Sequence, residues 1–220
     1  MRVVEISIAC AFFLLSTVLF RHIFVLYYPR SLKLGGLLLK TKSHLLLGKY
    51  IVGGIGTHAR KTQRWAFVFG CVEPDYNYLT YLRGSFSNRM FSGHTFESTA
   101  EYICEAIMRL EARVHFRYRD YYRLGKLIHY VVDAFTYAHN RNFPGSLPDH
   151  RSYEMELKEK FAAYLAERKA NAVPAMKPLF EALVDEHARY MKMPASQQKD
   201  MNFVERVACM LFSQLTPVAA

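Results

Sequence analysis

The chain has few cysteines, few acidic residues and no stretch in which apolar and polar residues alternate. Its four cysteines, Cys10, Cys71, Cys104 and Cys209, are widely scattered and form no CxxC pair, which argues against a disulfide framework and a thiolate zinc site. The lack of alternation argues against a β-sheet, and the sequence has no internal repeat. Its 220 residues, of which 51% are hydrophobic, are enough for one domain with an ample core.

Basic residues outnumber acidic ones, with 29 Lys and Arg against 19 Asp and Glu, and the formal net charge is +10. This balance predicts anionic partners such as phospholipid surfaces, phosphorylated substrates or nucleic acid. The basic and aromatic segment "RYRDYYRLGK", residues 117–126, is interpreted as the amphipathic start of a helix. It suits a phospholipid surface, and the alternative interpretation is an RNA-binding patch.

The first 38 residues form an apolar leader. Residues 6–20 are apolar without a break, but Arg21 and His22 interrupt the run, and a spanning helix needs about 20 apolar residues. Three interpretations stay open: a membrane anchor, a signal peptide that lacks a small-x-small cleavage site, and a misplaced start near Leu39. If the leader is an anchor, the basic residues that follow it would keep the domain cytoplasmic. Without the leader three cysteines remain, and an odd number favours a reducing compartment. We therefore expect a cytoplasmic or membrane-associated protein rather than a secreted one.

Residues 39–220 carry the apolar spacing of helices and are expected to form one all-α domain. Ser43 is predicted to cap a helix over 44–52, and Gly70 to end a helix that begins near Arg60. Further helices are expected over 94–112, 118–139, 149–171, 175–192 and 200–214. Loops are expected at 71–78, 143–149 and 193–196, where Pro, Gly and Asn end helices.

Five potential metal ligands lie in one short stretch: His129, Asp133, His139, His150 and Glu154. His129 and Asp133 are four residues apart, so they lie on one face of a helix and can share an ion. If this helix continued, His139 would be rotated by roughly 80° from that face and could serve a neighbouring ion. His150 and Glu154 repeat the spacing on the next helix. Together with His139 they form a three-ligand set of the kind that catalytic zinc uses.

Read with three upstream segments, this run resembles the zinc-dependent phospholipase C family, which shares a trinuclear zinc fold with P1-type nucleases. The family pattern is His, three residues, Asp, five residues, His, then a loop, His, three residues and Glu. Upstream, "SHLLLGKYIV" resembles the family's first-helix histidine segment, "EPDYN" its Asp-Tyr loop and "FSGHTF" its Phe-x-x-His segment. The resemblance spans about residues 42–161 and implies an all-helical domain of this type.

The resemblance implies two to three zinc ions. The first would be held by Asp75, His94, His129 and Asp133, the second by His139, His150 and Glu154, and the third by His44, with Asp133 bridging to the first. Secreted family members complete the third site with a mature N-terminal Trp, which this chain as written lacks. His58 is a candidate substitute ligand, and an exposed loop histidine is the alternative. The remaining histidines, His22, His115 and His187, are interpreted as leader or surface residues.

The implied activity is the hydrolysis of phosphodiesters. Zinc ions a few ångströms apart lower the pKa of a shared water and clamp a phosphoryl oxygen, so a bridging hydroxide can attack phosphorus. Asp75 and Asp133 would be both ligands and acceptors that orient the water. Tyr76 and Phe91 resemble the aromatic residues that line the family's head-group pocket, with core packing as the alternative. The expected substrate is a phospholipid head-group ester; the alternatives are a P1-like single-strand nuclease and a catalytically silent, metal-stabilised helical protein.

Overall fold

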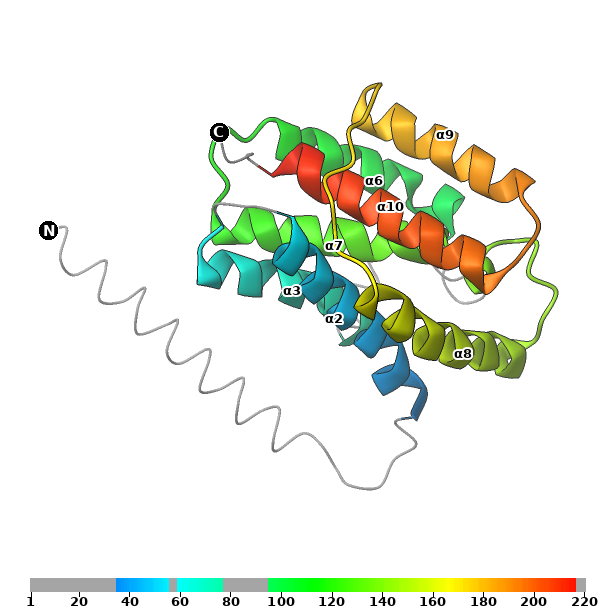
Figure 1. Ribbon diagram of the computed structural model, residues 1–220. Coiled ribbons are helices and arrows are strands. Elements are labelled where there is room, and N and C mark those ends of the chain that lie inside the picture. Colours follow the sequence, from blue (N-terminus) through cyan, green and yellow to red (C-terminus); the bar gives the residue numbers. More distant parts are fainter. Residues whose placement is uncertain (1–34, 56–58, 77–94, 217–220) are drawn as a thin grey trace, which may run out of the picture. The chain divides into compact units, whose positions relative to one another are not determined.

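The computed structural model describes residues 35–55, 59–76 and 95–216, and this part of the chain is all-helical (Figure 1). It contains seven α-helices and one 3-10 turn, and no strand among the residues described. The elements are α2 (Gly35–Gly54), α3 (Lys61–Tyr76), α6 (Phe96–Glu111), α7 (Tyr118–Ala134), η1 (Tyr137–His139), α8 (Leu147–Ala166), α9 (Leu179–Lys192) and α10 (Gln197–Leu215). Residues Gly35–Ala220 form one compact unit. None of the described helices combines the length and apolar character that crossing a membrane requires.

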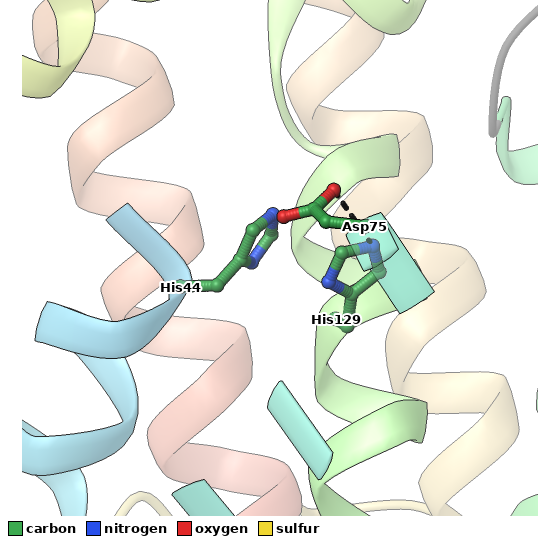
Figure 2. Close-up of side chains that lie close together, drawn as sticks. All are labelled: His44, Asp75 and His129. Atoms are coloured by element: carbon green, nitrogen blue, oxygen red, sulfur yellow. Dashed lines mark ion pairs between the residues drawn. The ribbon is translucent and has the colours of Figure 1, made fainter. Parts of the chain in front are cut away.

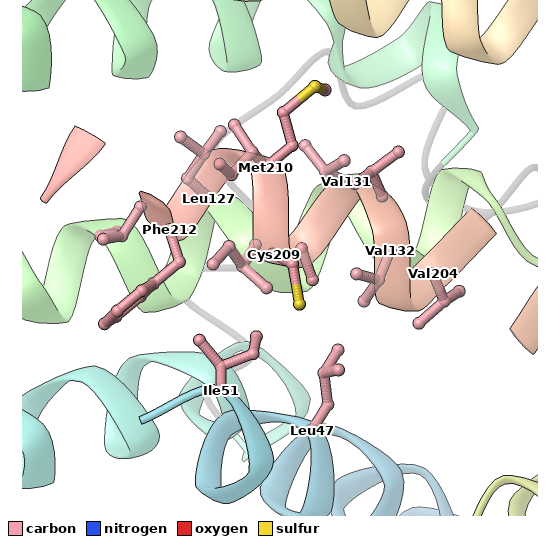
Figure 3. Close-up of a cluster of buried hydrophobic side chains, with 14 of the residues drawn as sticks. Leu47, Ile51, Leu127, Val131, Val132, Val204, Cys209, Met210 and Phe212 are labelled. Atoms are coloured by element: carbon pink, nitrogen blue, oxygen red, sulfur yellow. The ribbon is translucent and has the colours of Figure 1, made fainter. Parts of the chain in front are cut away.

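Helix α7 lies at the centre of the bundle and packs against α3, α6 and α10 (Figure 1). Its apolar side chains meet those of α2 and α10 in the core (Figure 3). Leu127 and Val131 of α7, Ile51 of α2 and Phe212 of α10 are almost completely buried. Burying an aliphatic or aromatic side chain of this size stabilises a fold by about 1.5–3 kcal/mol. This core fixes the helices that carry the candidate site.

Helices α3 and α7 run side by side in the same direction. Near their first residues, Gln63 Nε2 donates to the carbonyl oxygen of Phe116 at 3.0 Å. Near their last turns, His129 Nδ1 lies 2.9 Å from the carbonyl oxygen of Cys71. The first turns of α3 therefore lie beside the start of α7, and the last turns of the two helices lie beside each other. Asp75 at the end of α3 consequently lies beside the last turns of α7.

Two glycines allow these helices to approach closely. A Cβ at Gly70 would lie 2.2 Å from the carbonyl oxygen of Tyr122, and a Cβ at Gly125 would lie 2.2 Å from the carbonyl oxygen of Phe67. Backbone atoms cannot yield as a flexible side chain does, so neither position has room for a side chain.

Three expected helix boundaries were wrong. Gly70 does not end α3 because its missing side chain serves packing against α7, and α3 continues through Pro74 to Tyr76, where a loop was expected. Ser43 lies inside α2, which begins at Gly35, and so does not cap it. Helix α7 stops at Ala134 instead of continuing to residue 139. The other expected helices are confirmed, with ends that differ by a few residues.

The early end of α7 has a local cause. The side-chain amide of Asn140 donates to the carbonyl oxygens of Ala134 and Thr136 at 3.0 and 2.9 Å. These bonds satisfy carbonyl groups that a helix end leaves without partners and stabilise the bend after α7. His139 consequently lies in η1, beyond that bend, and the expected 80° rotation along a continuous helix does not apply.

Candidate metal centre

The first cluster joins side chains from three helices: His44 of α2, Asp75 of α3, and His129 and Asp133 of α7. His44 Nε2 lies 3.2 Å from Asp133 Oδ1, and His129 Nε2 lies 3.5 Å from Asp133 Oδ2 and 3.9 Å from Asp75 Oδ1. His44, Asp75 and His129 each offer one ligand atom, and these atoms lie within 4.8 Å of one another. Figure 2 shows these three side chains converging from separate elements.

The protonation of this cluster suits a cation. A carbonyl oxygen can only accept, so His129 Nδ1 carries the hydrogen that is donated to Cys71 O. Burial, together with the nearby His44, lowers the pKa of His129, which favours the neutral ring. The Nε2 lone pair of the neutral ring then faces the carboxylates of Asp75 and Asp133.

The carboxylates of this cluster fit the same interpretation. Burial opposes the ionisation of Asp133, but the surrounding histidines hold its pKa well below the ordinary value. Asp75 Oδ2 is buried and has no hydrogen-bond partner among the residues that the structure describes. Because neutral His129 carries its hydrogen on Nδ1, no proton lies between its Nε2 and the carboxylate oxygens of Asp75 and Asp133, and lone pairs that face negative charges in this way are costly when buried. A metal ion held among these atoms would remove that cost, so the residues fit zinc.

The second cluster consists of His139 of η1 and of His150 and Glu154 of α8. His139 Nε2 and His150 Nε2 lie 3.0 and 2.9 Å from the same oxygen, Glu154 Oε1. The three ligand atoms lie within 4.8 Å of one another. Two imidazoles and one carboxylate are a donor set that catalytic zinc uses. The prediction that these three residues lie together is confirmed. The continuous helix through His139 on which it was partly based was wrong.

Both clusters open on one pocket of about 580 Å³, open solvent included. His44 and Asp133 of the first cluster and His139 and Glu154 of the second line it. Apolar side chains make up much of the remaining wall, among them Leu47, Val132, Leu157, Phe161, Met201 and Val204. A phosphate group in this pocket could therefore meet both clusters at once.

Asp200 of α10 also lines the pocket, and sequence reasoning missed it. This residue is fully buried, and its Oδ2 accepts hydrogen bonds from the backbone amide of Tyr137 at 2.8 Å and from the Tyr153 hydroxyl at 2.7 Å. Its Oδ1 accepts from the Tyr190 hydroxyl at 2.8 Å. Burial raises the pKa of Asp200, and these hydrogen bonds oppose the rise. Asp200 thus ties η1 and α8, which carry the second cluster, to α10.

Other predicted residues fall in different places. His94, Phe91 and His58 lie outside the described residues. Tyr76 is the last residue of α3. His115 is exposed as expected.

The surface interpretation of His187 was wrong, because this residue is buried and its ring stacks on Phe96 with a centroid distance of 4.2 Å. The signal was present in the sequence. His187 follows Leu183 by four residues and precedes Tyr190 by three, which is the spacing of an apolar helix face.

Comparison with known proteins agrees with this geometry. A family model described as zinc dependent phospholipase C matches residues 43–200, well over half of the chain. The chain belongs to the zinc-dependent phospholipase C family, whose members are phosphodiesterase hydrolases. The match confirms the family resemblance and extends past the predicted limit of residue 161. No curated protein and no solved structure matches the chain.

Proposed function

We propose that this protein is a phospholipase C that hydrolyses head-group esters of phospholipids with bound zinc. The observation that carries the proposal is the pair of His and carboxylate clusters that open on one pocket with mostly apolar walls. In this proposal His44, Asp75, His129 and Asp133 hold zinc in the first cluster, and His139, His150 and Glu154 hold it in the second. Its location, cytoplasmic or at a membrane, stays a prediction.

Bound zinc would polarise a phosphoryl oxygen and lower the pKa of a water molecule beside the phosphorus. The chain's own residues would position the reactants. Asp133 contacts both His44 and His129, and it lines the pocket together with the second cluster, so it links the two groups of ligands. Asp75 offers a buried oxygen that could accept a proton from the attacking water. His129 is held in one tautomer by the backbone of α3.

The pocket wall bears on the substrate. Leu47, Val132 and Leu157 offer aliphatic surface, which suits the glycerol and first acyl carbons of a lipid. A single-strand nuclease would need a platform on which bases stack. Phe161 is the only Phe, Tyr or Trp among the described residues that line the pocket. This favours a lipid substrate over a nucleic acid.

The test compares three substrates with the zinc-loaded full chain: a soluble phosphocholine ester, a short-chain phosphatidylcholine and single-stranded DNA. We expect the phosphocholine esters to be cleaved faster than DNA, and chelation to abolish cleavage. Asp133→Asn should abolish turnover, whereas Asp185→Asn, at an exposed carboxylate on α9, should leave it unchanged. Faster cleavage of DNA would refute the lipid substrate, and equal activity of the two variants would refute the role of Asp133.

A further inference from the structure

One end of the α3 and α7 pair presents exposed apolar side chains among cations. Trp65, Val114 and Tyr118 are 69%, 83% and 49% exposed. Around them in the sequence lie exposed basic residues. They are Arg60, Lys61, Arg64, Arg113, Arg117 and Arg119. We call these nine residues the basic end.

The fold brings the two segments of the basic end together. The bond between Gln63 Nε2 and the carbonyl oxygen of Phe116, at 3.0 Å, joins residues that lie in the middle of each segment. Neither 59–65 nor 112–119 contains an acidic residue. Two carboxylates flank the second segment: Glu111 is exposed, and Asp120 is buried and lies 3.7 Å from Arg113. The basic end therefore carries six exposed cations, with one exposed carboxylate beside them, and three exposed apolar side chains.

We propose that the basic end binds the surface of an anionic lipid bilayer. Arg and Lys would meet lipid phosphates, while the indole of Trp65 and the side chains of Val114 and Tyr118 would enter the interfacial layer, where aromatic and long cationic side chains are favoured. A nucleic acid would use the cations equally well, but an aliphatic side chain that is 83% exposed offers nothing to a phosphate backbone. A bilayer uses both kinds of side chain.

The basic end is separate from the pocket. It lies at the start of α3 and α7, whereas Asp75 and Asp133 lie in their last turns, about 20 Å away at 1.5 Å per helical residue. Binding of a bilayer to the basic end would therefore leave the pocket open. The choice of lipid as partner rests on the proposed function, which supplies a substrate held in bilayers, but the binding itself needs neither zinc nor turnover.

Trp65 makes a direct test available, because it is the only tryptophan in the chain. Its fluorescence reports contact at the basic end even if another segment of the full chain also binds lipid. We expect phosphatidylcholine vesicles that contain phosphatidylserine to shift Trp65 emission to shorter wavelength, and brominated lipids to quench it. Added salt should reverse both effects, and pure phosphatidylcholine vesicles should cause much smaller ones. Chelated protein should behave in the same way as zinc-loaded protein.

Charge reversal supplies the matched variants. Lys61→Glu with Arg119→Glu changes two exposed positions in first helical turns, where acidic residues are common. Loss of two cations alone should raise the lipid concentration for the half-maximal shift by roughly 30-fold, and the added negative charges should raise it further. The control pair, Lys160→Glu with Lys192→Glu, makes the same charge change at exposed positions in α8 and at the end of α9 and should keep the shift.

Three outcomes would overturn the inference. Protein that sediments with anionic vesicles while Trp65 emission stays unchanged would bind them through another surface. A shift caused by single-stranded RNA but not by vesicles would identify a nucleic-acid surface. Equal loss in both variant pairs would show that only net charge matters. Failure to cleave the soluble ester would refute the proposed function and leave these binding results unaffected.

Discussion

Replacing Gly125 with alanine tests whether the close contact of α3 and α7 shapes the metal centre. The new Cβ would lie 2.2 Å from the Phe67 carbonyl oxygen and 2.8 Å from the Cys71 amide nitrogen, whereas ordinary contact begins at 3.4 Å. Both atoms belong to backbone, so the helices would have to separate by about 1 Å. Overpacking of this kind costs about 1–3 kcal/mol of unfolding free energy. For a domain of this size, that lowers Tm by roughly 2–12 °C.

The same separation should weaken zinc binding. Asp75 lies on α3 and His129 on α7, so a movement between the helices changes the distance between two proposed ligands of the first cluster. Ligand distances in zinc sites vary by only about 0.2 Å, which is much less than the movement expected. We expect a loss of affinity of about tenfold or more, as for changes in groups that orient ligands.

The assay pairs thermal unfolding, followed by circular dichroism, with chelator competition for zinc. Gly53→Ala is the control, because no atom lies within 4 Å of the added Cβ in α2. This control should bind zinc normally and unfold at the same or a slightly higher temperature. Wild-type Tm in Gly125→Ala would refute the contact itself. A lower Tm with unchanged zinc affinity would leave the contact intact but refute its link to the centre.

Three further predictions concern the centre and the domain. Chelation should lower Tm, because metal bound only by the folded chain stabilises it; an unchanged melting curve after verified zinc removal would contradict this. Asp200→Asn should weaken zinc binding at the second cluster by about 10–100-fold. The control is Glu205→Gln, which alters another α10 carboxylate that accepts from two tyrosine hydroxyls and should lower only Tm. Equal zinc affinities of these two variants would refute the role of Asp200. Residues 39–220 expressed alone should fold and bind zinc, and a zinc-free insoluble product beside a soluble full chain would count against this.

Much of the centre could be predicted from sequence because its pairs are local. His150 and Glu154 are four residues apart in one helix, and periodicity alone places them on one face. Asp200 could not be found in this way. It stands in the first turn of an amphipathic helix, where an acidic residue is ordinary, and its role depends on hydroxyl and amide groups from three other elements. No spacing rule connects these positions.

Glycine shows a second limit of the sequence. A glycine near the end of an apolar run predicts a helix terminus, because it tolerates the left-handed backbone found there. Gly70 instead lies inside α3 and removes a side chain at a crossing. Only the partner helix distinguishes the two uses, and the sequence does not identify that partner.

The parallel direction of α3 and α7 has an electrostatic consequence. Each helix carries a macrodipole with partial positive charge at its first turn and partial negative charge at its last, and neighbours that run in the same direction add these charges at each end. The last turns hold Asp75, His129 and Asp133, so two negative poles meet at the first cluster. Each pole favours a nearby cation by about 0.3–1 kcal/mol, and more where it is partly buried. At the opposite end, the two positive poles coincide with the cations around Trp65 and strengthen their attraction for anions. The pair is thus polarised along its length, with cations favoured at one end and anions at the other.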